Sequence, residues 1–543
     1  TRPAEPLAAD LRDHRDGKRL GLLKLIAGML GVGLDQLVQR ETLRRQRRLA
    51  IVAAASLSGM AVTSTLAIFA LDSRDDARDQ RREAEGLVGF MLGDLREKLE
   101  PVGRLDALDA VGSRALAYFQ KQDKTSLSDA ALAQRSRALS LLGEIATLRG
   151  DFDGALRRYN EALAGTAEMV SRAPDDPQRL FDHAQNLFYV SDIARQRGQL
   201  PRAEAALREY KRLADRMVAI DADNPKWRME TQYAAANLGT ALFEQRRFAE
   251  ATRQFQEALN TIEQLAAAEP GKSDYQKSVA ESLAWLADSQ RAEGRLDEAI
   301  GQRERQVALL NRLMVGGNGD VEYRQKAIPA YRALGRLFAS KGELDLAIAQ
   351  LRLAVSHAEE LIPTEPGNTM WRELAASARL DLAEMLLAHK QTDEAANQVR
   401  SGCDLIDRLI ARDHSVVSWR GLARSCLTMR ARIAWEAGAK GEALSLAERA
   451  LAAAKAAKWT EHVEERYTIA GAYRLVGDIQ RQTGDQRGAQ SSWQAGFAML
   501  PSGIKEKPPE TSERAELLQR VGRMDEAKQL KASLATMGYR KTG

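Results

Sequence analysis

Apolar and polar positions follow the spacing of amphipathic helices along most of the chain, and this pattern itself recurs at a fixed interval. Each copy holds two such stretches joined by a turn with Gly or charged residues, such as LRGDFDGAL and EQRRFAEAT. One alanine ends every turn motif, 48 residues after its predecessor in the first seven copies and then at intervals of 46 and 38. The alanines are Ala155, Ala203, Ala251, Ala299, Ala347, Ala395, Ala443, Ala489 and Ala527. A long fixed period of this kind predicts a stack of helical hairpins.

Other positions keep the same interval. Twelve residues before each of the first eight alanines stands a small residue, where a larger side chain would push the two helices of a hairpin apart. These residues are Gly143, Ser191, Gly239, Ala287, Gly335, Ala383, Ala431 and Gly477. An aromatic residue opens the first helix of six copies, at Trp227, Tyr275, Tyr323, Trp371, Trp419 and Tyr467. A coiled coil would instead repeat every 7 or 11 residues and would lack the Pro-containing corners seen here, such as DNPKW.

Residues 237 to 259, NLGTALFEQRRFAEATRQFQEAL, resemble a tetratricopeptide repeat, with a Leu-Gly pair, a turn, and Ala251, Phe255 and Ala258 on one helical face. The resemblance implies an all-α fold, a right-handed superhelical solenoid of about nine hairpins over residues 131–538. The usual repeat has 34 residues, so each unit of 48 carries 14 more, which predicts longer helices around the corners.

An uncharged run of 23 residues, Leu49 to Leu71, is long enough to cross a membrane as a helix, and residues 44–71 are predicted to form a basic flank and transmembrane helix. Four arginines precede the run and four aspartates follow it, at Arg44, Arg45, Arg47, Arg48, Asp72, Asp75, Asp76 and Asp79. This asymmetry places the N-terminus in the cytoplasm and the repeats outside it. The alternative is a buried core helix. A cleaved signal peptide fits poorly because the apolar run is too long.

Residues 1–43 contain a predicted amphipathic helix from Asp16 to Leu30. Two segments resemble bacterial proteins that join a Toll/interleukin-1 receptor (TIR) domain, one membrane helix and tetratricopeptide repeats. These segments are RDGKRLGLLKLIAGMLGVGLDQLVQRE and GFMLGDLREKLEPVGRLDALDAVG. The resemblance implies that residues 1–43 are the end of a TIR-like domain in a longer protein, and that the repeats lie outside a bacterial inner membrane. Residues 72–130, with an apolar stripe at Leu87, Met91, Leu95 and Leu99, are expected to form a stalk, a dimer contact or a cap on the first repeat.

Composition and motif content limit the binding and catalytic functions that the chain can have. Residues 1 to 48 hold 11 basic and 6 acidic side chains, which leaves 69 of each sign in the remainder. Such a neutral surface disfavours nucleic-acid binding. Cys403 and Cys426 are too few for a disulfide framework or a zinc site and are expected to be two small buried side chains. The six histidines show no metal-ligand spacing, and no catalytic motif is found. We therefore expect no catalytic residue, no cofactor and no metal, and a chain that is not itself an enzyme.

A solenoid of this kind has a concave surface, which the first helix of each hairpin lines. Eleven residues before the repeat alanines stand mostly charged residues, and two of them have an aromatic three positions earlier, as peptide recognition tends to use. The predicted peptide groove is Tyr189, Asp192, Asn237, Trp285, Asp288 and Arg336. The expected partners are a protein or peptide and the lipid bilayer, with a homo-oligomer as a further possibility through the small residues of the membrane run. We expect a membrane-anchored sensing or scaffolding module with a TIR-type output. The alternatives are an envelope assembly scaffold without signalling, or part of a NAD-cleaving TIR protein.

Overall fold

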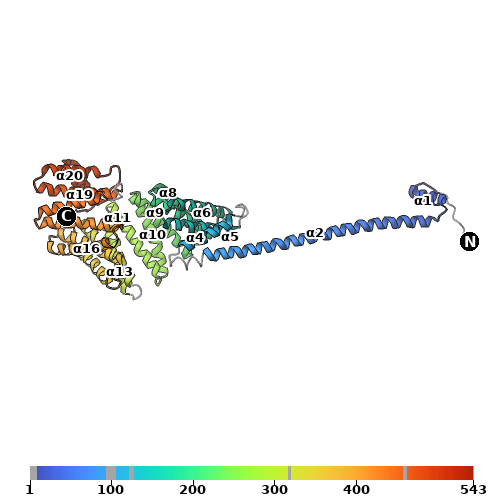
Figure 1. Ribbon diagram of the computed structural model, residues 1–543, viewed down its shortest axis with the longest axis horizontal. Coiled ribbons are helices and arrows are strands. Elements are labelled where there is room, and N and C mark those ends of the chain that lie inside the picture. The colour runs from blue at the N-terminus through green and yellow to red at the C-terminus, as the bar shows by residue number, and fades with distance from the viewer. Residues whose placement is uncertain (1–8, 93–104, 121–127, 316–319, 457–461, 542–543) are drawn as a thin grey trace. The chain divides into compact units, whose positions relative to one another are not determined.

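The computed structural model describes residues 9–92, 105–120, 128–315, 320–456 and 462–541, and every regular element in these ranges is a helix. The chain divides into two units, Thr1–Arg104 and Leu105–Gly543. In the first unit, α1 (Gly17–Leu30) ends at Gly31 and α2 (Leu34–Leu92) follows as one continuous helix (Figure 1). The predicted helix from Asp16 to Leu30 is thus observed.

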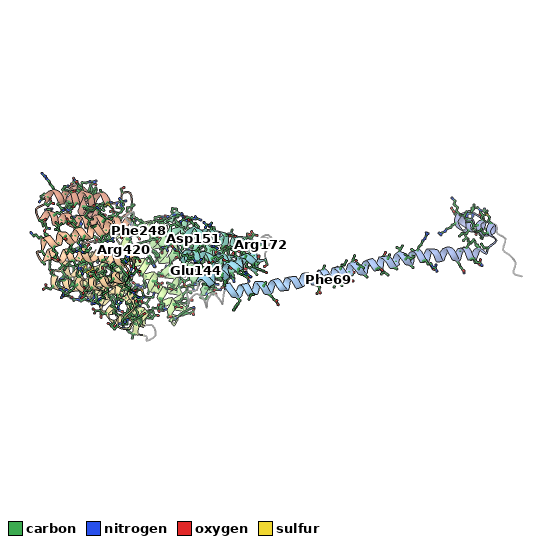
Figure 2. All side chains as sticks on the ribbon, in the orientation of Figure 1. Phe69, Glu144, Asp151, Arg172, Phe248 and Arg420 are labelled. Carbon is green, nitrogen blue, oxygen red and sulfur yellow. A yellow bond between two sulfur atoms is a disulfide. The ribbon has the colours of Figure 1, made fainter. Side chains whose placement is uncertain are left out.

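The apolar run lies inside α2. Residues Gln46–Ser73 are long and apolar enough to cross a membrane, with a mean hydropathy of 1.8 and no part of the apolar window buried. Phe69, for example, is 70% exposed, and its side chain stands away from the helix (Figure 2). Within the first unit, the described residues leave this segment exposed, and its crossing of a membrane stays a prediction.

The second unit consists of α4 and nine helical hairpins within the described residues, which confirms the predicted all-α solenoid (Figure 1). The hairpins are α5 (Asp129–Leu148) with α6 (Phe152–Arg172), α7 (Pro177–Gln196) with α8 (Leu200–Ile220), α9 (Pro225–Glu244) with α10 (Phe248–Ala268), α11 (Ser273–Glu293) with α12 (Leu296–Val315), α13 (Asp320–Lys341) with α14 (Leu344–Leu361), α15 (Thr369–Ala388) with α16 (Thr392–Arg412), α17 (Val417–Glu436) with α18 (Lys440–Lys455), α19 (Val463–Gln482) with α20 (Gln486–Met499), and α21 (Pro508–Arg520) with α22 (Met524–Thr536). Each helix packs on the next along the chain.

The 48-residue pattern has a direct steric cause. Eight of the nine repeat alanines are fully buried, and the ninth, Ala527, is nearly so. The small residue of each first helix faces the side chain four positions after the alanine: a Cβ on Gly239 would lie 2.7 Å from the Phe255 ring. The same pairing brings Gly143 against Tyr159. Gly335 against Leu351 and Gly477 against Trp493 repeat the same close approach, so these hairpins require a small residue at the same place in the sequence.

The turns between paired helices share one left-handed residue, five positions before the repeat alanine. It is Gly in seven turns, whereas Arg246 (φ 62°) and Lys390 (φ 63°) occupy the other two. An ordinary side chain in this conformation costs about 1–2 kcal/mol. The turn alone therefore does not explain why Arg246 and Lys390 stand here in place of glycine.

The helix α4 (Leu105–Gln120) packs on α5 and covers the first hairpin. Its side chains Leu108, Ala115 and Phe119 are buried, and Arg149 forms an ion pair with Asp109 at 2.7 Å. Within the segment 72–130, α4 thus packs on the first hairpin, and the role of the whole segment as a stalk, a dimer contact or a cap stays a prediction. Of the apolar stripe predicted upstream, Leu87 is exposed, and Leu95 and Leu99 lie outside the described residues.

The expectation for the two cysteines is half wrong. Cys403 on α16 and Cys426 on α17 are both buried, but they form a disulfide, with their Cα atoms 5.8 Å apart. Twenty-three residues and a helix corner separate them in sequence. Their proximity follows from the packing of α16 on α17, which sequence spacing alone does not reveal.

The ninth hairpin returns to the middle of the solenoid. Arg246, in the turn between α9 and α10, donates a hydrogen bond to the Lys505 carbonyl (2.7 Å) and pairs with Glu510 on α21. Further along, the Arg540 backbone N–H donates to the Ser340 carbonyl at the end of α13 (2.6 Å). The last hairpin and its tail thus close against the third to fifth hairpins.

Candidate functional site

The closure encloses a cavity of about 800 Å³. Its walls are the first helices α11, α13, α15, α17 and α19 on one side, and α21 with the C-terminal tail on the other. Four of the charged positions eleven residues before the repeat alanines line it, namely Arg336, Glu384, Arg432 and Asp478. The structure therefore places these positions on the inner wall of the cavity.

Most charges in this large cavity are matched by neighbours. Arg332 donates to Asp381 at 2.9 Å, and Arg432 pairs with Glu384 at 3.1 Å. Arg336 reaches the same Asp381 at 3.5 Å. Two guanidinium groups therefore share one carboxylate at the boundary with a second, smaller cavity.

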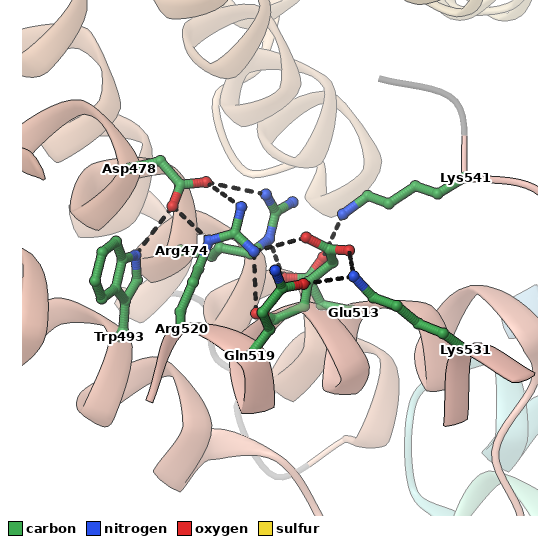
Figure 3. A network of polar contacts seen from close by, with 9 residues as sticks. Arg474, Asp478, Trp493, Glu513, Gln519, Arg520, Lys531 and Lys541 are labelled. Atoms are coloured by element: carbon green, nitrogen blue, oxygen red, sulfur yellow. Dashed lines mark hydrogen bonds and ion pairs between the residues drawn. The ribbon is translucent and has the colours of Figure 1, made fainter. Parts of the chain in front are cut away.

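A dense polar network holds the ninth hairpin in place (Figure 3). Asp478 on α19 accepts hydrogen bonds from Arg520 on α21 (2.5 and 2.9 Å) and from the Trp493 indole of α20 (3.0 Å). Arg474 on α19 donates to Glu513 on α21 at 2.6 Å. These contacts fix α21 on α19 and so position the wall that closes the cavity.

Glu516 on α21 belongs to the same network. It accepts from Arg520 (2.6 Å) and pairs with Lys531 on α22 (3.0 Å). Although burial opposes the charged form, the hydrogen bonds from these cations and the nearby Lys541 charge lower the pKa of Glu516 to about 2. The carboxylate is therefore ionised at any physiological pH and binds α21 to α22.

The second cavity, about 410 Å³, adjoins the first and is strongly cationic. Its walls come from α9, α11, α12, α13 and the start of α21. Five cations and one carboxylate line it, beside the rings of Phe243 and Trp285. The charged residues are Arg291, Arg303, Arg332, Arg336, Lys507 and Asp288.

Arg303 departs from the repeat. Four positions after the repeat alanine the other seven of the first eight hairpins carry Tyr159, Leu207, Phe255, Leu351, Val399, Ala447 and Trp493, all apolar or aromatic. The fourth hairpin has Arg303, which is only 5% exposed and donates to Asp288 and Gln306, each at 2.7 Å. Its Nε is buried and has no hydrogen-bond partner in the part of the chain that the structure describes. Sequence reasoning missed this residue, although the repeat register makes the exception visible.

Arg291 on α11 lies between the two cavities and lines both. Its Nε is also buried without a partner, and among the described residues no carboxylate is paired with its guanidinium. Burial and the charge of Arg336 lower the pKa of Arg291. Burying a cation beside other cations costs free energy, and a bound anion would lower that cost.

The structure brings together three of the six predicted groove residues. Trp285, Asp288 and Arg336 line the smaller cavity, and the Trp285 ring stacks on Phe255 with 5.5 Å between ring centroids. The role of these three in peptide binding stays a prediction.

The other three predicted residues, all on earlier hairpins, line neither cavity. Tyr189 stacks on Tyr159, Asp192 pairs with Arg195 at 3.1 Å, and the Asn237 amide donates to the carbonyl of its own helix at Tyr233. These three residues lie away from the part of the solenoid that the ninth hairpin closes, and their role in peptide binding also stays a prediction.

The class of protein that this architecture defines is a tetratricopeptide-like helical solenoid, and solved structures agree. The apo form of RapI matches with a TM-score of 0.51 at 10% identity, over 76% of this chain and 97% of that one. The apo form of the quorum sensor NprR from B. thuringiensis (TM-score 0.47, 11% identity, 75% and 99% covered) and a tetratricopeptide repeat protein from Parabacteroides merdae (0.36, 15%, 62% and 98%) are also similar. No protein-family model matches the chain, and no curated protein matches its sequence. At these identities the likeness shows the fold alone.

Proposed function

We propose that this chain is the membrane-anchored, ligand-capturing part of a bacterial signalling protein. The repeats bind a protein or peptide outside the cytoplasm, and α2 carries the occupancy of the repeats across the inner membrane. The observation that carries the proposal is the 800 Å³ cavity, which the first helices line with charged and polar side chains. A cavity of that size and polarity suits a peptide segment.

The support for the anchor is the apolar stretch of α2 and its flanks. Gln46–Ser73 can span a bilayer, and basic residues precede it while acidic residues follow it. The disulfide Cys403–Cys426 supports the same orientation, because disulfides persist in oxidising compartments such as the periplasm. The resemblance of residues 1–43 to the end of a TIR domain makes a cytoplasmic TIR module the proposed output.

Orientation is tested with the chain's own cysteines. Cells are denatured rapidly in a thiol-alkylating reagent, with and without prior reduction. We expect Cys403 and Cys426 to be alkylated only after reduction. Alkylation without reduction would show reduced thiols and would contradict an extracytoplasmic position of the repeats.

Ligand capture is tested by photo-cross-linking. A photoreactive residue replaces Trp285 in the cavity wall or, as the control, Leu353 on α14, which is exposed and lines neither cavity. Cross-linked products specific to position 285 are expected in cells. Products of equal yield at both positions would contradict binding in the cavity.

A further inference from the structure

We infer that the smaller cavity between α11, α12, α13 and the start of α21 is a binding site for an acidic peptide segment, with Arg303, Arg291 and Arg336 receiving its carboxylates. This inference rests on the proposed ligand-capturing function and names the chemistry of the ligand. It follows from three independent observations: a departure from the repeat, an excess of positive charge, and the position of the cavity at the closure.

The departure from the repeat is Arg303. At the equivalent position of other hairpins, Tyr159 or Phe255 fills the space over a glycine, and Leu207 and Leu351 show that leucine also fits the fold. A guanidinium with an unsatisfied buried Nε at a packing position destabilises a hairpin that leucine would stabilise. Residues that break the local rule of a fold at a stability cost concentrate at functional sites.

The excess of charge follows from the pairs around the cavity. Arg332 and Arg336 share Asp381, Arg303 pairs with Asp288, and Lys507 pairs with Glu464 at 3.1 Å. Arg291 forms no ion pair among the described residues and its buried Nε has no partner there, although the charge of Asp288 acts on it. The five lining cations thus meet three carboxylates, an excess of two positive charges in a partly desolvated space.

The apolar walls define the rest of the ligand. Trp285, 41% exposed, and Phe243 present ring surface beside the guanidinium groups. An acidic residue next to an apolar one matches both features. Since guanidinium groups form paired hydrogen bonds with carboxylates, the fit is specific and not only electrostatic.

The position of the cavity links ligand binding to the packing of the ninth hairpin against the third to fifth hairpins. Lys507 and Pro509 of the ninth hairpin line it together with residues of the third to fifth hairpins. The Lys507 ammonium also lies over the Phe243 ring, 5.3 Å from its centroid. A bound anion would therefore contact both sides of the closure and hold them together.

The test uses the full chain reconstituted in nanodiscs and a fluorescent peptide of Glu, Gly and Phe, with Gln replacing every Glu in the matched peptide. We expect the Glu peptide to bind, the Gln peptide to bind at least about tenfold more weakly, and added salt to weaken only the Glu peptide. Arg303→Leu is expected to lower affinity for the Glu peptide about tenfold to a hundredfold while leaving the fold as stable or more stable. The control Arg305→Leu, on the exposed side of the same helix, is expected to bind like the native chain.

Each alternative result has a defined meaning. Equal binding of the two peptides, or unchanged binding by Arg303→Leu, would overturn the acidic ligand while leaving peptide capture standing. Displacement by inorganic phosphate at the same concentration as the Glu peptide would identify a simple oxyanion site and also overturn the inference. Failure of both peptides, together with no cross-linking at position 285, would refute the proposed function itself.

Discussion

The substitution Gly239→Ala tests the packing rule behind the 48-residue period. Gly239 lies in α9, and the added methyl group would lie 2.7, 2.8 and 3.0 Å from three carbons of the Phe255 ring. Ordinary carbon contacts are about 3.5–4.0 Å, so the ring would have to move by roughly 0.7 Å or more. Phe255 is fully buried and stacked on Trp285, which leaves it little room.

The magnitude follows from two opposing effects. Alanine improves a helix interior by about 0.5–1 kcal/mol relative to glycine. Overpacking of a tight contact costs about 1–3 kcal/mol. We therefore expect a net destabilisation of about 1 kcal/mol, with an upper limit of about 2.5 kcal/mol. The matched control is Gly301→Ala in α12, where no atom lies within 4 Å of the added group and the helix gain of about 0.5–1 kcal/mol should appear alone.

The assay is hydrogen exchange of the amides in α9 and α10, because a solenoid does not unfold in a single two-state step. Gly239→Ala should reduce protection there, whereas Gly301→Ala should raise it in α12. A double-mutant cycle with Phe255→Leu should recover part of the loss, since the smaller side chain vacates the contact. Equal effects of the two alanine substitutions, or no coupling to Phe255, would refute the steric explanation of the repeat.

Three further predictions concern the turns, the disulfide and pH. Arg246→Gly should reduce the protection of the α21 amides from hydrogen exchange, because the ion pair of Arg246 with Glu510 is lost. Lys390→Gly at the equivalent turn should instead stabilise its hairpin by about 1 kcal/mol, because glycine adopts the left-handed conformation without strain. Reduction of Cys403–Cys426 should destabilise the α16–α17 region by about 3 kcal/mol, the loop-closure value for a separation of 23 residues, and thermal scans with and without reductant check it. Because the pKa of Glu516 is about 2 in the folded chain and about 4.5 when unfolded, its contribution is present above pH 4.5 and is lost as pH falls towards 2, up to about 3 kcal/mol. Glu516→Gln should flatten this pH dependence of exchange in α21–α22.

The sequence predicted the hairpins well because their constraints are local and repeated. The contact of Gly239 with Phe255 joins residues within one hairpin, and the hairpins of Gly143, Gly335 and Gly477 repeat it at the same spacing in the sequence. The long apolar helix was equally predictable because its length and lack of charge can be read directly from the sequence. Trp285, Asp288 and Arg336 line a cavity because position within a first helix decides which side chains face inward, whereas their role in binding stays a prediction.

What escaped prediction depends on the geometry of the whole solenoid. The contact between Arg246 and Glu510 spans 264 residues and arises only because the curvature of the solenoid brings the ninth hairpin back to the third. The disulfide depends on the packing of one hairpin on the next, and no repeated pattern records a contact made once. Arg303 can be recognised in the sequence as an exception to the repeat. Its position at a cavity could not be predicted, because that cavity forms only when the ninth hairpin closes on the earlier ones.

The closure of the ninth hairpin on the third to fifth hairpins is tested most directly by cross-linking. Cysteines replace Lys341 and Arg540, which lie together because the Arg540 N–H donates to the Ser340 carbonyl and its side chain passes over Gly342. The native disulfide is left intact, and a short reagent specific for two thiols is added to the reconstituted chain. We expect rapid cross-linking within one chain for this pair and none for a control pair of Arg197 and Arg540. An open solenoid would give no cross-link in either pair and would contradict the closed cavity.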